Sequence, residues 1–456
     1  MPTLTQSLAR LIRLRHVAVE DVRAAERFVR DWLGALGAGG ATEAGTLLRA
    51  YAAEAHGIED RVFLAAALSH ITETDDLHRA SVTHPGCIVI PVALLLGRSL
   101  GVSGRQVLTA VLAGYEAMLR IGESLGPAHY RVFHNTATAG VFGAAAAAAS
   151  LLGLSDDGWQ WALGNAGTQA AGLWQFNEDA TMSKHLHAGH AAHAGLRAAL
   201  LARHGFTGPA AILEGERGFF RGYCPDARPE RVLADADGWK LHETSLKPYP
   251  CCRHTHPAID AALTVRDRLT HGITTPGARA SSSDDILAGR VGDPEASFKH
   301  VDVRTYAAAL HVTDEPCPET SYAAKFSIQY CVASALLFGT PGLASFDMNA
   351  IRDARLRALL PRIAVHLDRE LEDAYPGAWG AEVSVTDAAG STHSRRVRCA
   401  RGDPESPLDD EELNEKVQGL LHYGRLPDEV VTRLLAECTS MPEGGAVQAI
   451  PWLDRK

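Results

Sequence analysis

The spacing of apolar residues changes once along the chain, and that change limits the folds open to it. Up to about residue 262, apolar residues recur every three or four positions, as they do in helices packed on one face. One such stripe joins Leu4, Leu8 and Leu11, and another lies between Val22 and Leu36. Glycine and alanine crowd residues 140–172, where small side chains let helices approach closely. This part of the chain predicts a multi-helix bundle.

Beyond residue 262 the apolar pattern shortens to alternation with β-branched residues, which is typical of strands. We expect a hairpin connection at residues 387–390 and an amphipathic helix over residues 322–339. Near the carboxyl terminus the helical pattern returns. The predicted fold is therefore mainly α, with a large multi-helix domain over residues 1–262 and 405–456 and a smaller α+β domain over residues 263–404. The expected strands lie at residues 301–304, 363–367, 381–386 and 391–397.

Composition argues against several classes of partner. Of the 456 residues, 21% are charged and the net charge is −10, so the chain lacks the basic excess typical of nucleic-acid binding. The most apolar run, at residues 87–96, is interrupted by Pro91 and is too short to span a bilayer. Eight cysteines without a repeated CxxC spacing fit a reducing compartment and do not suit an iron–sulfur cluster. We expect a cytoplasmic protein with no nucleic-acid and no membrane partner.

Two clusters of ionisable residues precede apolar helices. The first, residues 73–86, holds three acids beside two histidines, and it is either a solvated loop or a site. In the functional interpretation, His84 stands just before a helix that Pro85 helps to start, and a nearby acid orients it. The second is His134, which leads into a small-residue helix. His134 is either a polar helix end or the floor of a cleft where backbone N–H groups favour an anion.

A third cluster combines Lys184 with His187, which share one face of a predicted helix. Histidines recur every three residues from His187, which raises the possibility of metal binding. We disfavour it because the face drifts with each step and no HExxH motif accompanies them. A cationic helix start that faces a carboxylate is the better chemical interpretation.

The fourth cluster, residues 247–256, carries Lys247 and Arg253 on a segment stiffened by two prolines. A stiff segment suits a pair of fixed carboxylate clamps. The adjacent Cys251 and Cys252 leave a zinc site as the alternative.

Together the clusters supply histidines for proton transfer and cations for carboxylate binding. No GxGxxG or GxxxxGK motif appears where a strand would run into a helix. Removing a proton next to a carboxylate creates an enolate-like charge that cationic or hydrogen-bonding groups must stabilise. Elimination, epimerisation and decarboxylation share that need, so the residue chemistry leaves all three open.

Several stretches occur in the order found in MmgE/PrpD proteins, and the chain resembles this family from about residue 70 to residue 410. They include DDLHRASVTHPG from Asp75, SKHLHAGHAAHAGLRAALLARHGFTGP from Ser183, KPYPCCRHTHPAIDAA from Lys247 and AAKFSIQYCVA from Ala323. The family contains 2-methylcitrate dehydratase, cis-aconitate decarboxylase and iminodisuccinate epimerase. The resemblance implies a helical domain with a smaller α+β lid domain and an active site in the cleft between them. It also implies a homodimer that uses no metal and no other cofactor.

The family's site residues carry over onto matching positions of this chain. By resemblance, His84 and His134 are the proton-transfer candidates, with Lys184 and Asp75 beside them as catalytic residues. Residue chemistry and resemblance together assign substrate binding to Asp76, His187, Lys247, Arg253 and Tyr330.

The implied activity is that of a cofactor-independent lyase on a small di- or tricarboxylate, of the 2-methylcitrate dehydratase type. An epimerase or isomerase, a decarboxylase and a catalytically inactive binding protein stay open as alternatives. Leu77 replaces a threonine that often follows the aspartate pair, and Cys252 stands where decarboxylases have a histidine. These departures argue against cis-aconitate decarboxylase. Residues 276–299 are expected to form an exposed insertion at the domain junction.

Overall fold

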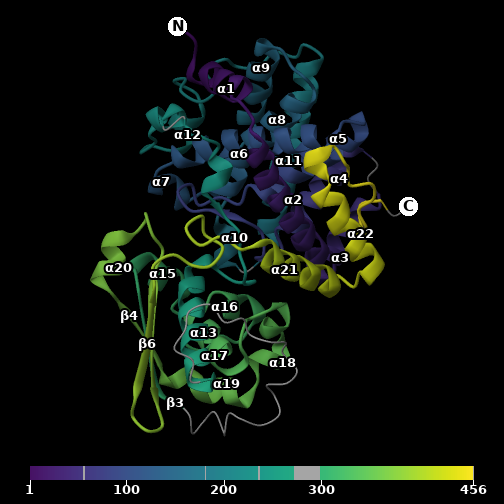
Figure 1. Ribbon diagram of the computed structural model, residues 1–456. Helices are drawn as coiled ribbons and strands as arrows, with labels where there is room; N and C mark the ends of the chain where they lie inside the picture. Colours follow the sequence, from purple (N-terminus) through teal and green to yellow (C-terminus); the bar gives the residue numbers. More distant parts are fainter. Residues whose placement is uncertain (55–56, 180, 235–236, 272–297, 455–456) are drawn as a thin grey trace. The chain divides into compact units, whose positions relative to one another are not determined.

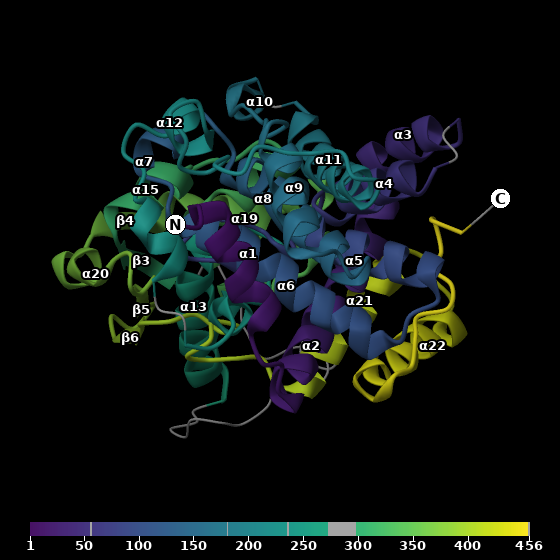
Figure 2. The same ribbon diagram turned by 90° about the horizontal axis from the view of Figure 1, so that it is seen from above.

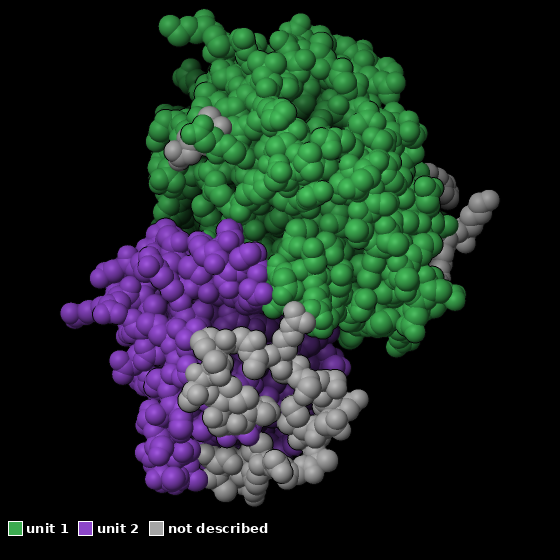
Figure 3. All heavy atoms as spheres, viewed as in Figure 1, with its two compact units in different colours: residues 1–246, 408–456 green, residues 247–407 purple. Residues whose placement is uncertain are grey.

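The computed structural model describes residues 1–54, 57–179, 181–234, 237–271 and 298–454. Two compact units divide the chain (Figure 3): unit 1 comprises residues 1–246 and 408–456, and unit 2 comprises residues 247–407. The fold is mainly α with a smaller α+β portion, as predicted. Among the described residues, strands form one two-stranded ladder in unit 1 and one four-stranded sheet in unit 2.

Unit 1 is a helical bundle built around one small-residue helix, α8 (Asn135–Leu151), which is buried along nearly its whole length. The views in Figure 1 and Figure 2 show α8 among α5 (Gly86–Leu100), α6 (Gly104–Glu123) and α11 (Ser183–Arg203), all of which pack against it. The other helices of this unit are α1 (Leu4–Leu14), α2 (Val19–Gly40), α3 (Glu43–Ala52), α4 (Ile58–Ser69), α7 (Pro127–Tyr130), α9 (Asp156–Gly167), α10 (Gln175–Glu178), α12 (Phe219–Tyr223), α21 (Asp410–Tyr423) and α22 (Asp428–Thr439).

Two glycines bring the backbones of α6 and α8 into contact. A Cβ atom on Gly114 would lie 2.8 Å from the carbonyl oxygen of Gly143, and one on Gly143 would lie 2.9 Å from the carbonyl oxygen of Gly114. Real side chains do not approach backbone oxygens so closely, so each position requires glycine. The prediction that small residues serve close helix packing is confirmed at this crossing.

Helix ends in unit 1 follow their local sequence. Ser155 caps α9 by accepting a hydrogen bond from the N–H of Gly158, and an acidic first turn follows it. Asp409 caps α21 in the same way, and Lys416 of that helix forms an ion pair with Asp31 of α2. Because α21 packs against α2, the last part of the chain joins the first helices of unit 1.

Unit 2 contains a mixed sheet with strand order β4-β3-β5-β6. β3 (Phe298–Thr305) pairs in parallel with β4 (Ile363–Leu367), whereas β5 (Ala381–Asp387) runs antiparallel to β3 and forms a hairpin with β6 (Thr392–Val397). All four expected strands are confirmed. α13 (His256–His271) packs on β5 and β6, and α17 (Ile328–Phe338) packs on α13.

The helix predicted between residues 322 and 339 is confirmed as α17, but the chain first forms a separate short helix, α16 (Ser321–Lys325). Ser327 has extended backbone angles, and its hydroxyl accepts a hydrogen bond from the N–H of Tyr330 at 2.9 Å. Serine is a preferred N-cap, so it ends one helix and starts the next. The insertion predicted over residues 276–299 lies outside the described residues up to residue 297. The other helices of unit 2 are α15 (Ala307–Thr313), α18 (Met348–Ile351), α19 (Ala354–Leu359) and α20 (Arg369–Ala374).

Candidate active site

An acidic loop between α4 and α5 positions two neighbouring aspartates. The chain leaves α4 at His70, turns at Glu73 with a φ of 61°, and forms β1 (Leu77–His78), which pairs with β2 (Thr244–Ser245). The backbone N–H of Gly86, the first residue of α5, donates to Oδ1 of Asp76 at 2.9 Å. Asp76 therefore satisfies a free N–H at the start of α5. His84 and Pro85 directly precede this helix, as predicted.

Asp76 is buried, and both of its carboxylate oxygens are engaged within unit 1. The hydroxyl of Tyr115 donates to Oδ2 at 2.7 Å, while Oδ1 receives the N–H of Gly86. Burial raises the pKa of Asp76 to about 8, and the neighbouring Asp75 adds to the rise, although both hydrogen bonds favour the ionised form. Asp76 therefore holds a proton at neutral pH, and in that form its Oδ2–H can donate to the hydroxyl oxygen of Tyr115 in place of the reverse bond. Its contacts tie the acidic loop to α5 and α6.

Asp75 lies between two histidines. Its Oδ2 is 2.6 Å from Nδ1 of His70 and 3.4 Å from Nδ1 of His84. The same nitrogen of His84 lies 2.6 Å from the backbone carbonyl oxygen of Asp76. A carbonyl oxygen only accepts, so Nδ1 of His84 carries the hydrogen, and in the neutral ring Nε2 is the basic nitrogen.

His134 directly precedes α8, as predicted, and lies in a group of rings. Its backbone N–H donates to the carbonyl oxygen of Gly172 at 3.0 Å. Its ring stacks on that of His70, with centroids 5.6 Å apart and planes 16° apart, and lies 4.9 Å from the Trp174 ring. Its Nδ1 is 3.4 Å from Nδ1 of His187. Burial, with nearby positive charge as a smaller cause, holds the pKa of His134 well below its usual range, so the ring is neutral at pH 7.

Helix α11 brings a cation and a further ring to the same place. Lys184 is buried, and its ammonium forms an ion pair with Glu73 of the acidic loop. His187 follows on the same helix face, where burial lowers its pKa to about 4. The predicted pairing of Lys184 with His187 on one face thus brings a cation and a neutral ring toward the acidic loop.

The predicted site residues divide between the two units. Those of unit 1 lie near one another, and several of them surround the ring of His70. We use the name histidine cluster for His70, Asp75, His84, His134, Lys184 and His187. The others belong to unit 2, where Lys247, Arg253 and Tyr330 are all buried. Arg253 forms an ion pair with Asp403, and the Tyr330 hydroxyl donates to the carbonyl oxygen of Ser345.

Sequence reasoning missed His70, Tyr115 and Trp174. His70 closes an apolar helix, and its only signal is an acidic segment that begins three residues later. Tyr115 lies in the middle of an apolar stretch of α6 and Trp174 lies in a loop, and no motif in the local sequence marks either residue. Each of the three makes at least one contact in the site with a residue far away in the sequence.

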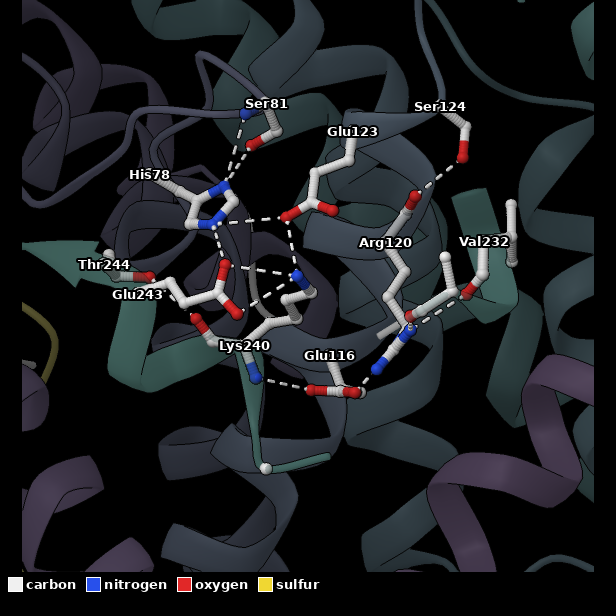
Figure 4. A network of polar contacts seen from close by, with 12 residues as sticks. His78, Ser81, Glu116, Arg120, Glu123, Ser124, Val232, Lys240, Glu243 and Thr244 are labelled. Atoms are coloured by element: carbon white, nitrogen blue, oxygen red, sulfur yellow. Dashed lines mark hydrogen bonds and ion pairs between the residues drawn. The ribbon is translucent and has the colours of Figure 1, made fainter. Parts of the chain in front are cut away.

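Three groups of described residues bring possible metal-ligand atoms within 4.8 Å of one another. In the first, Nδ1–H of His84 is committed to a carbonyl, so Nε2 is the nitrogen of this ring that a metal would meet. In the second, drawn in Figure 4, Nζ of Lys240 lies 3.1 Å from the carboxylates of Glu123 and Glu243 and already supplies the positive charge. The histidine series of α11 and the adjacent cysteines of unit 2 belong to none of these groups. The groups are His70, Asp75 and His84; His78, Glu123 and Glu243; and Cys399, Asp403 and Glu405.

No helix in the described part of the chain combines the length and the apolar character needed to cross a bilayer.

Known proteins match this chain along most of its length. A family model described as the MmgE/PrpD N-terminal domain matches residues 6–232, and one described as the MmgE/PrpD C-terminal domain matches residues 249–440. The cis-aconitate decarboxylase of Homo sapiens is 28% identical over 445 residues, which cover 91% of this chain and 87% of that protein. The enzyme of the same name from Mus musculus is 28% identical over 78% of this chain and 70% of its own length. The 2-methylcitrate dehydratase of Cupriavidus necator is 28% identical over 41% of this chain and 35% of its own length.

Proposed function

Since the chain belongs to the MmgE/PrpD family, we propose that it is a lyase that acts on a small di- or tricarboxylate by moving a proton next to a carboxylate. The observation that carries the proposal is the histidine cluster, where neutral rings lie beside a buried cation. A base must be unprotonated at the working pH, and the enolate-like charge that it creates needs a cation or a hydrogen-bond donor at hand.

The geometry supports a division of roles among the predicted residues. Nε2 of His84 is the basic nitrogen, because its Nδ1–H is committed to the carbonyl of Asp76 and lies near Asp75. The neutral ring of His134 is the second proton-transfer group. Lys184 supplies the positive charge, and a substrate carboxylate would compete with Glu73 for its ammonium. Because Lys184 and Glu73 are both buried, that competition selects for an anionic substrate.

Two reactions, which differ in the group that leaves the substrate, fit this arrangement. Loss of water from a 2-methylcitrate-type hydroxy acid is favoured by Leu77 and Cys252, which depart from the pattern expected of a decarboxylase. Loss of carbon dioxide from a cis-aconitate-type acid is favoured by the extent of similarity, since cis-aconitate decarboxylases match far more of this chain than 2-methylcitrate dehydratases do. Both reactions pass through the same charged intermediate, so the histidine cluster serves either.

A proton NMR time course in deuterated buffer tests the proposal. The full chain is offered 2-methylcitrate, citrate, cis-aconitate and an iminodisuccinate-type substrate in separate samples. Appearance of an alkene without carbon dioxide identifies the hydro-lyase, and release of carbon dioxide identifies the decarboxylase. Solvent exchange with inversion at the carbon next to the carboxylate would identify an epimerase and overturn the lyase proposal. Silence on all four substrates would also overturn it, in favour of a catalytically inactive binding protein.

A further inference from the structure

His70 is the most buried ring of the histidine cluster, and its exposed fraction is 0%. Its Nδ1 lies 2.6 Å from Oδ2 of Asp75, its face stacks on His134, and its ring meets His84 edge to face with centroids 5.1 Å apart. His70 thus contacts Asp75 and both proton-transfer candidates. His84 and His187 are more exposed, so a substrate reaches those rings before it reaches His70.

Burying the ring of His70 lowers the stability of the fold, so packing alone does not explain why a histidine occupies this position. Its Nε2 is buried and has no hydrogen-bond partner among the described residues. Burying an unsatisfied polar atom costs about 1–3 kcal/mol, which a leucine or phenylalanine of similar size would avoid. The polar function of this ring is therefore concentrated at Nδ1, the atom that contacts Asp75.

The contact with His70 favours the ionised form of Asp75. A carboxylate taken out of water is costly unless hydrogen-bond donors surround it. Its Oδ2 receives Nδ1–H of His70 at 2.6 Å, whereas Nδ1 of His84 lies farther away at 3.4 Å and is closer to the carbonyl of Asp76. His70 is thus the nearer donor, and His84 feels the resulting negative charge on the side of its Nδ1–H.

We propose that His70 is a positioning residue, which holds Asp75 as the buried anion that fixes His84 in the tautomer with a basic Nε2. The consequence for turnover rests on the proposed function, whereas the tautomer does not. The ionisable groups that face this arrangement come from three elements. They are Glu73 and Asp76 on the acidic loop, Cys87 at the start of α5, and Lys184, His185 and His187 on α11.

Two substitutions at residue 70 separate the donor from the ring. In His70→Asn the side-chain amide N–H can occupy the place of Nδ1–H, whereas His70→Leu removes the donor. We expect His70→Leu to lower kcat on the order of 100-fold with little change in KM, because the base rather than substrate binding is affected. The acid limb of its pH profile should also move to lower pH, since His84 loses the neighbouring anion. His70→Asn should restore most of kcat and the wild-type profile.

His78→Leu is the matched control, because His78 is equally buried and lies next to carboxylates outside the cluster. Figure 4 shows its Nε2 directed at Glu123 and Glu243, 3.5 and 3.8 Å away. We expect this variant to lower the melting temperature and to leave the pH profile unchanged. A profile altered equally in His78→Leu and His70→Leu would reduce the effect to general destabilisation and overturn the proposal.

Nitrogen NMR of histidine-labelled full-length protein tests the tautomer without any substrate. The His84 signals, assigned by their loss in His84→Gln, should show a protonated Nδ1 and an unprotonated Nε2 in the wild type and in His70→Asn. In His70→Leu this preference should weaken. An unchanged tautomer in His70→Leu would overturn the proposal, and so would a His70→Asn variant as inactive as His70→Leu. An inactive wild type with the expected spectra would refute the proposed function alone.

Discussion

Replacing Asp76 with asparagine should make the stability of unit 1 less dependent on pH. Burial holds the pKa of Asp76 at about 8 in the folded protein, whereas the ordinary value is 3.8. Between these values the folded state keeps a proton that the unfolded state releases, so stability is lost as pH rises and the loss is complete above the folded pKa. A shift of one pKa unit corresponds to about 1.4 kcal/mol, so the free energy of unfolding falls by about 1.4 kcal/mol for each pH unit in this range. The total loss between pH 3.8 and about 8 is about 6 kcal/mol.

Asparagine can keep the contacts that Asp76 makes. Its amide oxygen can accept the N–H of Gly86, and its amide nitrogen can donate to the hydroxyl oxygen of Tyr115. The substitution therefore removes the titration with little change in packing. We expect Asp76→Asn to be more stable than the wild type near pH 8, with the advantage shrinking by about 1.4 kcal/mol for each unit of lower pH.

Urea unfolding at a series of pH values from about 5 to 8, followed by far-UV circular dichroism, measures this slope. The control is Asp157→Asn, because Asp157 is exposed in the first turn of α9 and lies outside the site. A constant difference between Asp76→Asn and wild type would refute the reasoning. It would mean that Asp76 is ionised in the folded protein and that the donors of Tyr115 and Gly86 outweigh burial.

Four further substitutions test the packing and the site. Gly86→Ala should lower the unfolding free energy by about 1–3 kcal/mol in urea titrations, because its Cβ would lie 2.9 Å from both Asp76 Oδ1 and the Tyr115 hydroxyl; an unchanged midpoint would show that the loop relaxes. Lys184→Met and His134→Asn should each lower kcat by at least about 100-fold in the NMR assay while circular dichroism stays native, and full activity in both would refute the site assignment. Arg253→Met removes a guanidinium from the buried Asp403 and should cost about 3–5 kcal/mol of stability in unit 2; a raised KM with an unchanged melting temperature would instead make Arg253 a substrate ligand.

Local patterns predicted the elements of this fold better than the breaks inside them. Alternation located β4 to the residue, and the return of the helical pattern near the carboxyl terminus located α21 and α22. The break between α16 and α17 was missed because the apolar pattern continues through it, while a single serine hydroxyl decides where α17 begins. A cap is a contact of one side chain, and a periodicity averaged over several turns does not detect it.

The sequence predicted those site residues that their chemical type and their local sequence mark. His84 and His134 could be singled out because each stands beside the start of an apolar helix. The partner of Lys184 could not, since Glu73 lies on another element and only the fold brings the two together. His70 was missed for the same reason: nothing in its own neighbourhood shows that its ring will stack on His134. Pairings between distant segments depend on helix packing, which composition and spacing do not specify.

The backbone contact between α6 and α8 has a consequence for how the chain tolerates mutation. Gly114 is followed directly by Tyr115, the partner of Asp76, and Gly143 lies on the helix that begins after His134. Any side chain at either glycine must push the two helices apart, and the displacement would be carried to both of these site residues. In a saturation-mutagenesis screen for turnover, the two glycines should therefore appear as intolerant as the histidines, although neither is a chemical participant. Intolerance at these positions would reflect the spacing between α6 and α8 that both glycines set. A parallel screen for folded protein would distinguish this structural effect from a direct role in catalysis.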